Sequence, residues 1–509
     1  MNTSYRELKE RLAEIVDLEK TAELLRWDQQ VKMPPGGSAA RAERLATLGR
    51  IAHERFVDPG IGRLLDGLES FEESRPYDSV EASLVRVTRR DWRKARRVPS
   101  DLLVELTRAA ALAYPAWVEA RQRSDFSLFL PHVERQFELR RRYVDCFDDF
   151  DEPYDVLLDD FEPEMRTAQV RRVFERLKAE QIPLVEAVGE RGHADHPPGH
   201  YPVERQRRFE RDVVDRFGFD PEAWRCDETV HPFESAPSRN DIRITTRHFE
   251  DSLDGLFAAM HEFGHGLYEH QVAPELERTP LCRGASLGLH ESQSRMWENL
   301  VGRSRPFWRF FWPRLKETFP QALGDVETDD WFHLVNRVQP SLIRVEADEV
   351  TYNLHIILRF ELEQDLLSGH LKPTDLPEAW NARMEEYLGV EVPDDRRGVL
   401  QDVHWAGGHI GYFPTYALGN VIAAQIWERV QEDLPDLESE FEQGEFGSLR
   451  AWLGENLHKH GRKFTTAETL ERVVGAPLDP EPYLRYLRDK MESAYALPGS
   501  AGPSESSAG

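Results

Sequence analysis

Apolar residues recur at intervals of three and four along most of this 509-residue chain. Three stretches show the pattern clearly, at residues 6–27, 163–188 and 345–369. Such spacing places apolar side chains on one face of an α-helix. Alternation of apolar and polar residues, the mark of a half-buried strand, is rare. The pattern therefore predicts a predominantly helical, all-α fold.

The best strand candidate is "NDIRITTRHF" at residues 240–249, where Ile242, Ile244 and Thr246 alternate with polar residues. The Ser, Pro and Asn of the preceding "ESAPSRN" are typical of a turn. Together the two segments predict a small hairpin that leads into the next helix. Pro232 would confine the first strand to an edge or an irregular end of a sheet.

Targeting and redox features are few. No window approaches 18 uninterrupted apolar residues, and the N-terminal segment has neither the apolar stretch nor the cleavage site of a signal peptide. The three cysteines, Cys146, Cys226 and Cys282, are scattered and outside CxxC spacing. We therefore expect no membrane span, no disulfide framework and no thiolate zinc site, and a cytoplasmic location.

The net charge of −27 disfavours nucleic acid as a partner, because phosphate backbones would be repelled. The acidic surface fits either ordinary solvation or adaptation to high salt, and the sequence leaves both readings open. No internal repeat or interdomain linker is evident. We therefore expect a single domain over residues 1–497 and a disordered polar tail over 498–509.

The stretch "AAMHEFGHGLYEH" at residues 258–270 carries a candidate metal motif. On a helix, His261 and His265 lie four residues apart on one face and can aim both imidazoles at one ion. Glu262 points to an adjoining side, where it can reach a water without being forced to bind the metal. This is the geometry behind the HExxH motif of zinc hydrolases.

A catalytic zinc site needs a third protein ligand and an open position for water. Glu291 is the candidate, because it lies on the next segment with helical periodicity. A chance HExxH match, or two histidines that only pack in a core, is the alternative. The amphipathic helix, the hairpin before it and the glutamate after it favour a zinc hydrolase.

Further motifs connect the chain to a known family. They are "LLRWDQQVKMPP" at 24–35, "HPF" at 231–233, "DIRIT" at 241–245, "HEFGH" at 261–265, "HESQS" at 290–294, "IRVEAD" at 343–348, "GVLQDVHW" at 398–405 and "GYFPTYALGN" at 411–420. With these motifs in this order, the chain resembles the carboxypeptidase Taq family of metallocarboxypeptidases over nearly its whole length.

The resemblance implies a neurolysin-like fold with a deep active-site groove and a small β-sheet beside the zinc helix. It implies a homodimer that binds Zn²⁺, or in some members Co²⁺. It also implies an enzyme that releases single amino acids, with broad preference, from peptides that have a free C-terminus. Nothing in this picture calls for nucleic acid or a membrane.

The motifs suggest roles for individual residues. Glu262 would act as general base and then general acid. Arg344, in "IRVEAD", is the first choice to bind the terminal carboxylate, because its fork matches two oxygens. The alternative is that Arg344 only pairs with Asp348, four residues on. Arg243, in "DIRIT", is the second choice, and Asp241 could hold it.

Other motif residues would complete the groove. His404 and Tyr412 are candidates to stabilise the oxyanion, with Tyr416 less favoured. Gln401 would bind the substrate backbone, and His231 would help to close the groove end. Glu298 and Asp348 are candidates to support the zinc histidines.

Two other functions stay open at this level. One is a zinc oligopeptidase that cuts internally in short peptides. The other is a catalytically silent relative that only binds peptides, although intact His261, Glu262, His265 and Glu291 argue against it.

Overall fold

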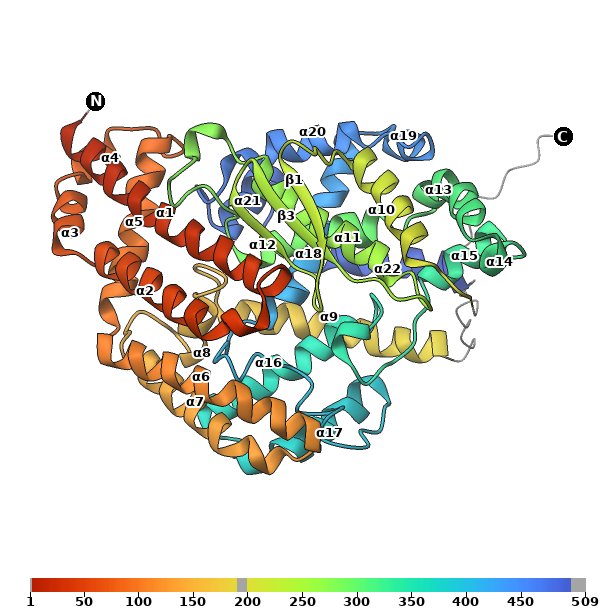
Figure 1. The fold of residues 1–509 in the computed structure, drawn as a ribbon, viewed down its shortest axis with the longest axis horizontal. Helices are drawn as coiled ribbons and strands as arrows, with labels where there is room; N and C mark the ends of the chain where they lie inside the picture. Colours follow the sequence, from red (N-terminus) through yellow and green to blue (C-terminus); the bar gives the residue numbers. More distant parts are fainter. Residues whose placement is uncertain (1, 190–198, 496–509) are drawn as a thin grey trace.

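The computed structural model describes residues 2–189 and 199–495, so the tail predicted for 498–509 lies outside the described residues. Helices dominate it (Figure 1), which confirms the predicted fold class. The first half of the chain contains α1 (Thr3–Val31), α2 (Ser38–Phe56), α3 (Pro59–Asp66), α4 (Glu69–Glu73), α5 (Val80–Arg97), α6 (Ser100–Arg123), α7 (Leu130–Val144), α8 (Pro153–Leu158), α9 (Thr167–Gly189) and α10 (Val203–Phe217).

A three-stranded sheet follows, with β1 (Trp224–Glu228), β2 (Glu234–Ser238) and β3 (Asp241–Thr246). The remaining helices are α11 (Asp254–His270), α12 (Leu287–Arg295), α13 (Arg305–Thr318), α14 (Pro320–Leu323), α15 (Thr328–Val335), α16 (Tyr352–Ser368), α17 (Leu376–Leu388), α18 (Pro414–Asp433), α19 (Leu437–Glu442), α20 (Gly447–Asn456), α21 (Thr466–Val473) and α22 (Glu481–Tyr495).

The sheet has the strand order β1-β3-β2. Strands β2 and β3 pair antiparallel, which confirms the predicted hairpin, and β2 lies at an edge as Pro232 required. Strand β1 pairs parallel to β3 and was not predicted. Its sequence, "WRCDE", offers only Trp224 as a buried anchor, so it carries no alternating pattern.

Helix α1 covers the outer edge of the sheet. The side chain of Asn2 caps the helix by accepting hydrogen bonds from the first-turn amides of Ser4 and Tyr5. Near its C-terminal half, Lys20 donates to the carbonyl of Ala236 at 2.6 Å, and Glu23 accepts from the amide of Ala236 at 2.7 Å. The backbone of β2 is therefore paired on its outer side with side chains of α1.

Helices α11, α12 and α18 form the centre of the molecule, and two glycines allow their close approach. A Cβ at Gly264 of α11 would lie 2.4 Å from the carbonyl oxygen of Gln293 on α12. A Cβ at Gly419 of α18 would lie 2.5 Å from the Glu291 side chain. The helix carrying Glu291 is thus pressed between α11 and α18.

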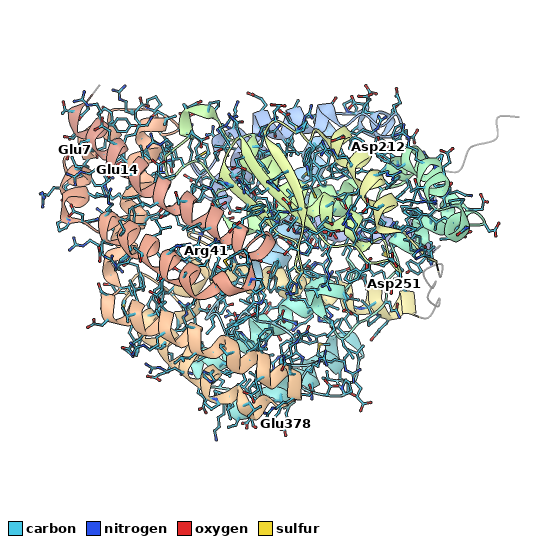
Figure 2. All side chains as sticks on the ribbon, in the orientation of Figure 1. Glu7, Glu14, Arg41, Asp212, Asp251 and Glu378 are labelled. Carbon is cyan, nitrogen blue, oxygen red and sulfur yellow. The ribbon has the colours of Figure 1, made fainter. Side chains whose placement is uncertain are left out.

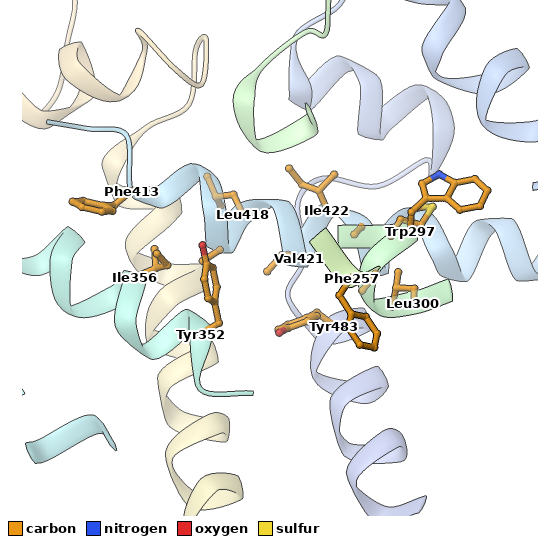
Figure 3. Close-up of a cluster of buried hydrophobic side chains, with 14 of the residues drawn as sticks. Phe257, Trp297, Leu300, Tyr352, Ile356, Phe413, Leu418, Val421, Ile422 and Tyr483 are labelled. Carbon is orange, nitrogen blue, oxygen red and sulfur yellow. The ribbon is translucent and has the colours of Figure 1, made fainter. Parts of the chain in front are cut away.

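An apolar core surrounds this packing. Figure 3 shows Trp297, Leu300, Ile356, Val421 and Ile422 within one cluster of buried hydrophobic side chains, contributed by three segments far apart in sequence. All five side chains are buried. A second, smaller cluster joins α1, α2, α3 and α5 to the loop over residues 272–282. The N-terminal helices therefore carry a core of their own, beside the main one.

Helix α16 begins later than predicted. Residues 344–346 form a short 3₁₀ turn, and the helix starts only at Tyr352. The Asp348 carboxylate accepts hydrogen bonds from the amides of Val350 and Thr351, which holds the turn just before this start. The alternative pairing of Arg344 with Asp348 is wrong, because Arg344 pairs with Asp402 instead.

Acidic side chains project from separate faces of the molecule, including the exposed Glu7, Glu14, Asp251 and Glu378 that Figure 2 labels. None of the helices in residues 2–189 and 199–495 combines the length and the apolar character needed to cross a membrane.

Candidate active site

Three predicted metal ligands converge between α11 and α12. His261 and His265 project from one face of α11, and Glu291 projects from α12. The Nε2 atoms of His261 and His265 lie 3.7 and 3.5 Å from the same oxygen, Oε2 of Glu291. All three donor atoms lie within 4.8 Å of one another. Two imidazoles and one carboxylate at this spacing suit a tetrahedral divalent ion.

Each ligand has its other polar atom held by the protein. Nδ1 of His261 lies 2.9 Å from Oε2 of Glu298. Oε1 of Glu291 accepts from Nε of Arg295 at 2.7 Å. Arg295 also contacts Glu298 at 3.1 Å, so one guanidinium links both carboxylates. Glu298 lies in a π-helical turn, Met296–Val301, that directly follows α12.

His265 is held by a longer relay. Its Nδ1 lies 2.5 Å from Nδ1 of His290, and Nε2 of His290 lies 3.0 Å from Oε1 of Glu269. If His290 donates to the Glu269 carboxylate, its Nδ1 accepts from His265, and this tautomer leaves Nε2 of His265 with a lone pair. All three ligands are therefore pre-oriented toward one point, which fits a divalent metal.

Burial and charge set the ionisation of the two central glutamates. Burial opposes ionisation of Glu291, but Arg295 and His261 outweigh it and hold its pKa well below the usual range. Burial raises the pKa of Glu262 to about 7. One carboxylate is thus kept charged for a cation, while its neighbour can take up a proton near neutral pH.

Arg344 lies in a second buried network. Its Nε and Nη2 both contact Oδ1 of Asp402 at 2.9 Å, and its Nη1 donates to the Tyr352 hydroxyl at 3.0 Å. Asp402 also accepts from Nε of Arg359 at 2.7 Å. Burial opposes the charge on Asp402, but Arg344 and Arg359 hold its pKa well below its usual range.

His404, Tyr412 and Tyr416 lie together at the start of α18 and in the loop before it. Nε2 of His404 is 3.2 Å from the Tyr416 hydroxyl, and the Tyr412 ring centre is 5.2 Å from that of Tyr416. Burial lowers the pKa of His404 to about 3 and raises the pKa of Tyr412 to about 12. The charge on Glu291 adds to the shift of Tyr412, and both side chains are neutral near pH 7.

The other predicted binding residues differ in how they are engaged. Oε1 of Gln401 accepts from the backbone amide of Arg344 and from Arg359, and its Nε2 donates to the carbonyl of Leu342. Arg243 makes two hydrogen bonds to Asp241, at 2.8 and 2.9 Å.

His231 is exposed in the loop before β2. Within the described part of the chain, it makes no hydrogen bond or ion pair, to the metal ligands or to any other residue.

A cavity of about 970 Å³ reaches the outer partners of His265, although none of the metal ligands lines it. His290 and Glu269 line one part of it, and α1, α2, α5 and the edge strand β2 contribute further lining residues. The outer partners of His265 thus border a large hollow that a peptide chain could occupy.

Sequence reasoning missed several supporting residues, namely Arg295, His290, Glu269, Tyr352, Arg359 and Asp402. Arg295 follows Glu291 by four residues, and that spacing could have revealed it. His290 and Asp402 lie inside motifs already noted, "HESQS" and "QDVHW". For Glu269 and Arg359 no local signal exists, because their partners come from distant segments. Tyr352 bonds Arg344 eight residues earlier, a separation that matches no helical spacing.

Comparison with known proteins agrees with this site. The curated relatives include thermostable carboxypeptidase 1 of Thermus thermophilus, 43% identical over 97% of this chain and 99% of its own length. Carboxypeptidase 1 of Bacillus subtilis is 35% identical over 98% of this chain and 100% of its own.

Among solved structures, an M32 carboxypeptidase from Deinococcus radiodurans superimposes with a TM-score of 0.94, at 40% identity, over 97% of this chain and 100% of that chain. The sequence profile described as carboxypeptidase Taq (M32) metallopeptidase matches residues 7–491. The chain therefore belongs to the carboxypeptidase Taq family of metallopeptidases.

Proposed function

We propose that this enzyme removes single residues from the C-termini of peptides, with the metal held by His261, His265 and Glu291. The observation that carries the proposal is the convergence of these three donor atoms beside the buried Glu262. The names of the relatives support the same activity.

We propose zinc as the metal, with cobalt as a substitute. Two imidazoles and one carboxylate are the protein ligands of many catalytic zinc sites. When bound, the ion would polarise the scissile carbonyl and make water more acidic.

Glu262 would move the proton. A carboxylate whose pKa lies near 7 can accept a proton from the attacking water and return it to the leaving amine. Burial keeps bulk water away from this carboxylate, so the proton stays at its oxygen between the two transfers.

Arg344 would anchor the terminal carboxylate. Arg344 has five N–H donors. Asp402 engages the donor on Nε and one donor on Nη2, and the Tyr352 hydroxyl accepts from one donor on Nη1. Two donors at the tip of the fork are left for two carboxylate oxygens. Arg243 stays the second candidate to bind the terminal carboxylate, and His231 would help to close the groove end. Gln401 would hold the Arg344 backbone, in addition to its predicted contact with the substrate backbone.

Tyr412 would donate a hydrogen bond to the developing oxyanion, since its phenol is neutral and lies near Glu291. His404 would orient this pair of tyrosines through Tyr416. The role of Tyr412 rests on the influence of the Glu291 charge on its phenol, and the role of His404 rests on its contact with Tyr416.

Mass spectrometry of defined peptides tests the proposal. Peptides with a free C-terminus should yield ladders shortened from that end, and a chelator should stop them. C-terminally amidated peptides of the same sequence should stay intact. Internal fragments from amidated peptides would instead favour an oligopeptidase.

We also propose a cytoplasmic homodimer organised as one domain over residues 1–497. The family resemblance supports the dimer, and the three free thiols suit a reducing compartment. Light scattering coupled to size-exclusion chromatography tests the oligomeric state.

A further inference from the structure

A basic cleft interrupts the acidic surface of this protein. Helix α5 and the segment 147–166 line a cavity of about 530 Å³. Seven of its fifteen lining residues are Lys or Arg and four are Asp or Glu, whereas the whole chain carries a net charge of −27. Its lining therefore holds more cations than carboxylates, although Glu72, Asp148 and Asp160 pair with lining cations from outside it.

Two of its arginines are not neutralised by a carboxylate. Arg86 donates to the backbone carbonyls of Tyr77 and Lys463. Arg93 is exposed and makes no hydrogen bond or ion pair within residues 2–189 and 199–495. Because the two residues are seven apart, they lie on the same face of α5.

The cations next to Arg86 and Arg93 on α5 are paired with carboxylates. Arg89 pairs with Glu72, and Lys94 pairs with both Asp159 and Asp160. These pairs offset their own charge, so the positive potential of the cleft comes chiefly from Arg86 and Arg93. Phe147, Phe150 and Met165 supply apolar surface between them.

The basic cleft neighbours the large cavity that His290 and Glu269 line. Arg90, Lys94 and Asp159 line both hollows. The larger cavity is bounded elsewhere by His290 and Glu269, the relay that holds His265. A chain that extends from the metal site through the larger cavity would reach α5 with its more distant residues.

We propose that this cleft binds acidic side chains of the peptide substrate, upstream of the bond that is cut. Arginine forks match carboxylates in shape and charge, and the apolar lining suits the rest of the side chain. The cleft would offset the repulsion between an acidic peptide and an acidic enzyme. The inference rests on the proposed carboxypeptidase activity, with the larger cavity as the peptide groove.

Matched peptides test the inference. They share their C-terminal half and length and carry Glu, Gln or Lys at the upstream positions. In low salt, kcat/KM for the Glu peptide should exceed that for the Gln peptide by about tenfold, the effect of one charge-assisted hydrogen bond, and the Lys peptide should be poorest. The preference should appear in KM and should fade as salt is added.

Arg93→Gln should remove part of this preference, and Arg86→Gln with Arg93→Gln should remove nearly all of it. Arg96→Gln is the matched control, because Arg96 lies on the same helix over the Trp92 ring and outside the cleft. It should keep the preference. Arg86→Gln removes two hydrogen bonds to backbone carbonyls, so thermal melting is used to check that this variant is folded. Arg93→Gln breaks no such bond.

Equal rates for Glu and Gln peptides in the unaltered enzyme would overturn the inference, as would a preference that survives in the double variant. A double variant that slows all three peptides equally would also overturn it, because that result indicates a structural role. Failure of the proposed function would look different: no peptide would be shortened from its C-terminus at all.

Discussion

Two buried ion networks lie side by side in this protein and use their charges differently. Around α12, Arg295 links Glu291 and Glu298, yet one oxygen of Glu291 and one nitrogen of each histidine converge on a shared point. Around Asp402, the charged atoms of Arg344 and Arg359 turn mainly toward the same carboxylate. The first network is arranged to receive a cation, whereas the second is largely self-contained.

The difference shows how charge balance separates a metal site from a structural cluster. In the first network Arg295 and Arg303 pair with Glu298, and Arg295 also pairs with Oε1 of Glu291, but Oε2 of Glu291 faces only the two histidine nitrogens and can therefore bind a cation. The second holds one carboxylate and two arginines, so it has positive charge to spare for an anion. A peptide carboxylate is such an anion, which is consistent with the proposed role of Arg344.

The largest expected effect comes from Glu262→Gln, which alters the first network without touching a ligand. Turnover should fall by about 10³-fold or more, since proton transfer is lost. Metal content, measured by elemental analysis of the purified protein, should stay at the level of the unaltered enzyme. Near-normal hydrolysis would show that Glu262 is not the base.

The second network is tested by Asp402→Asn, which leaves two buried arginines without their carboxylate. Removing one partner of a buried ion pair should lower the free energy of unfolding by about 3–5 kcal/mol. Denaturant unfolding measures the loss.

Asp365→Asn is the control for this experiment. Asp365 pairs with Arg383 at a half-exposed site, so its loss should cost less than about 1 kcal/mol. Similar values for the two variants would contradict the contrast between buried and surface pairs.

The outer partners of the two histidines can be compared directly. Glu298→Ala and Glu269→Ala should each weaken metal binding by about 10–100-fold, because each removes the group that orients a ligand. Competition with a chromogenic chelator measures the affinity. Glu428→Ala is the control, because Glu428 pairs with Arg485 at the surface, and it should leave the metal affinity unchanged. If only one of the two variants bound metal more weakly, the histidine on the unaffected side would be oriented by other contacts.

Arg344→Lys tests whether the second network has a task beyond stability. Lysine keeps the charge but loses the fork, so KM for peptides with a free C-terminus should rise by about tenfold. Arg243→Lys should change KM less. The reverse order would assign the anchor to Arg243.

The smallest effect is expected at a third cluster, where the Nε2 and Nδ1 atoms of His248 contact Glu210 and Glu228, each at 2.9 Å. Burial alone would lower the pKa of His248, but the hydrogen bond and charge of Glu210, joined by Glu228, raise it. The stability gained from protonated His248 is therefore full below its unfolded pKa of about 6.5 and is lost as pH rises through the folded pKa.

His248→Gln should accordingly destabilise the protein more in acid than at alkaline pH. Thermal melts of the variant and the unaltered protein, from acid to alkaline pH, measure the difference in stability at each pH. A constant difference at every pH would mean that the ion pairs contribute nothing.

The metal ligands could be predicted because helical spacing alone brings His261 and His265 to one face. The hairpin was predictable for a similar reason, since its alternation and turn residues are local. The partners of Arg344 were not, because Asp402 lies on a distant segment and the spacing to Asp348 pointed elsewhere. Strand β1 escaped notice because pairing with β3, and not its own composition, makes it a strand.

The hydrogen bonds that Lys20 donates to the Ala236 carbonyl and that Glu23 accepts from the Ala236 amide have a consequence for solubility. An uncovered edge strand offers its backbone to the edge of another sheet and invites aggregation. Here an amphipathic helix occupies that edge, so the protein can expose a charged helix where it would otherwise expose a strand. Loss of α1 would therefore do more than remove a wall of the groove, because it would leave β2 free to associate with other chains.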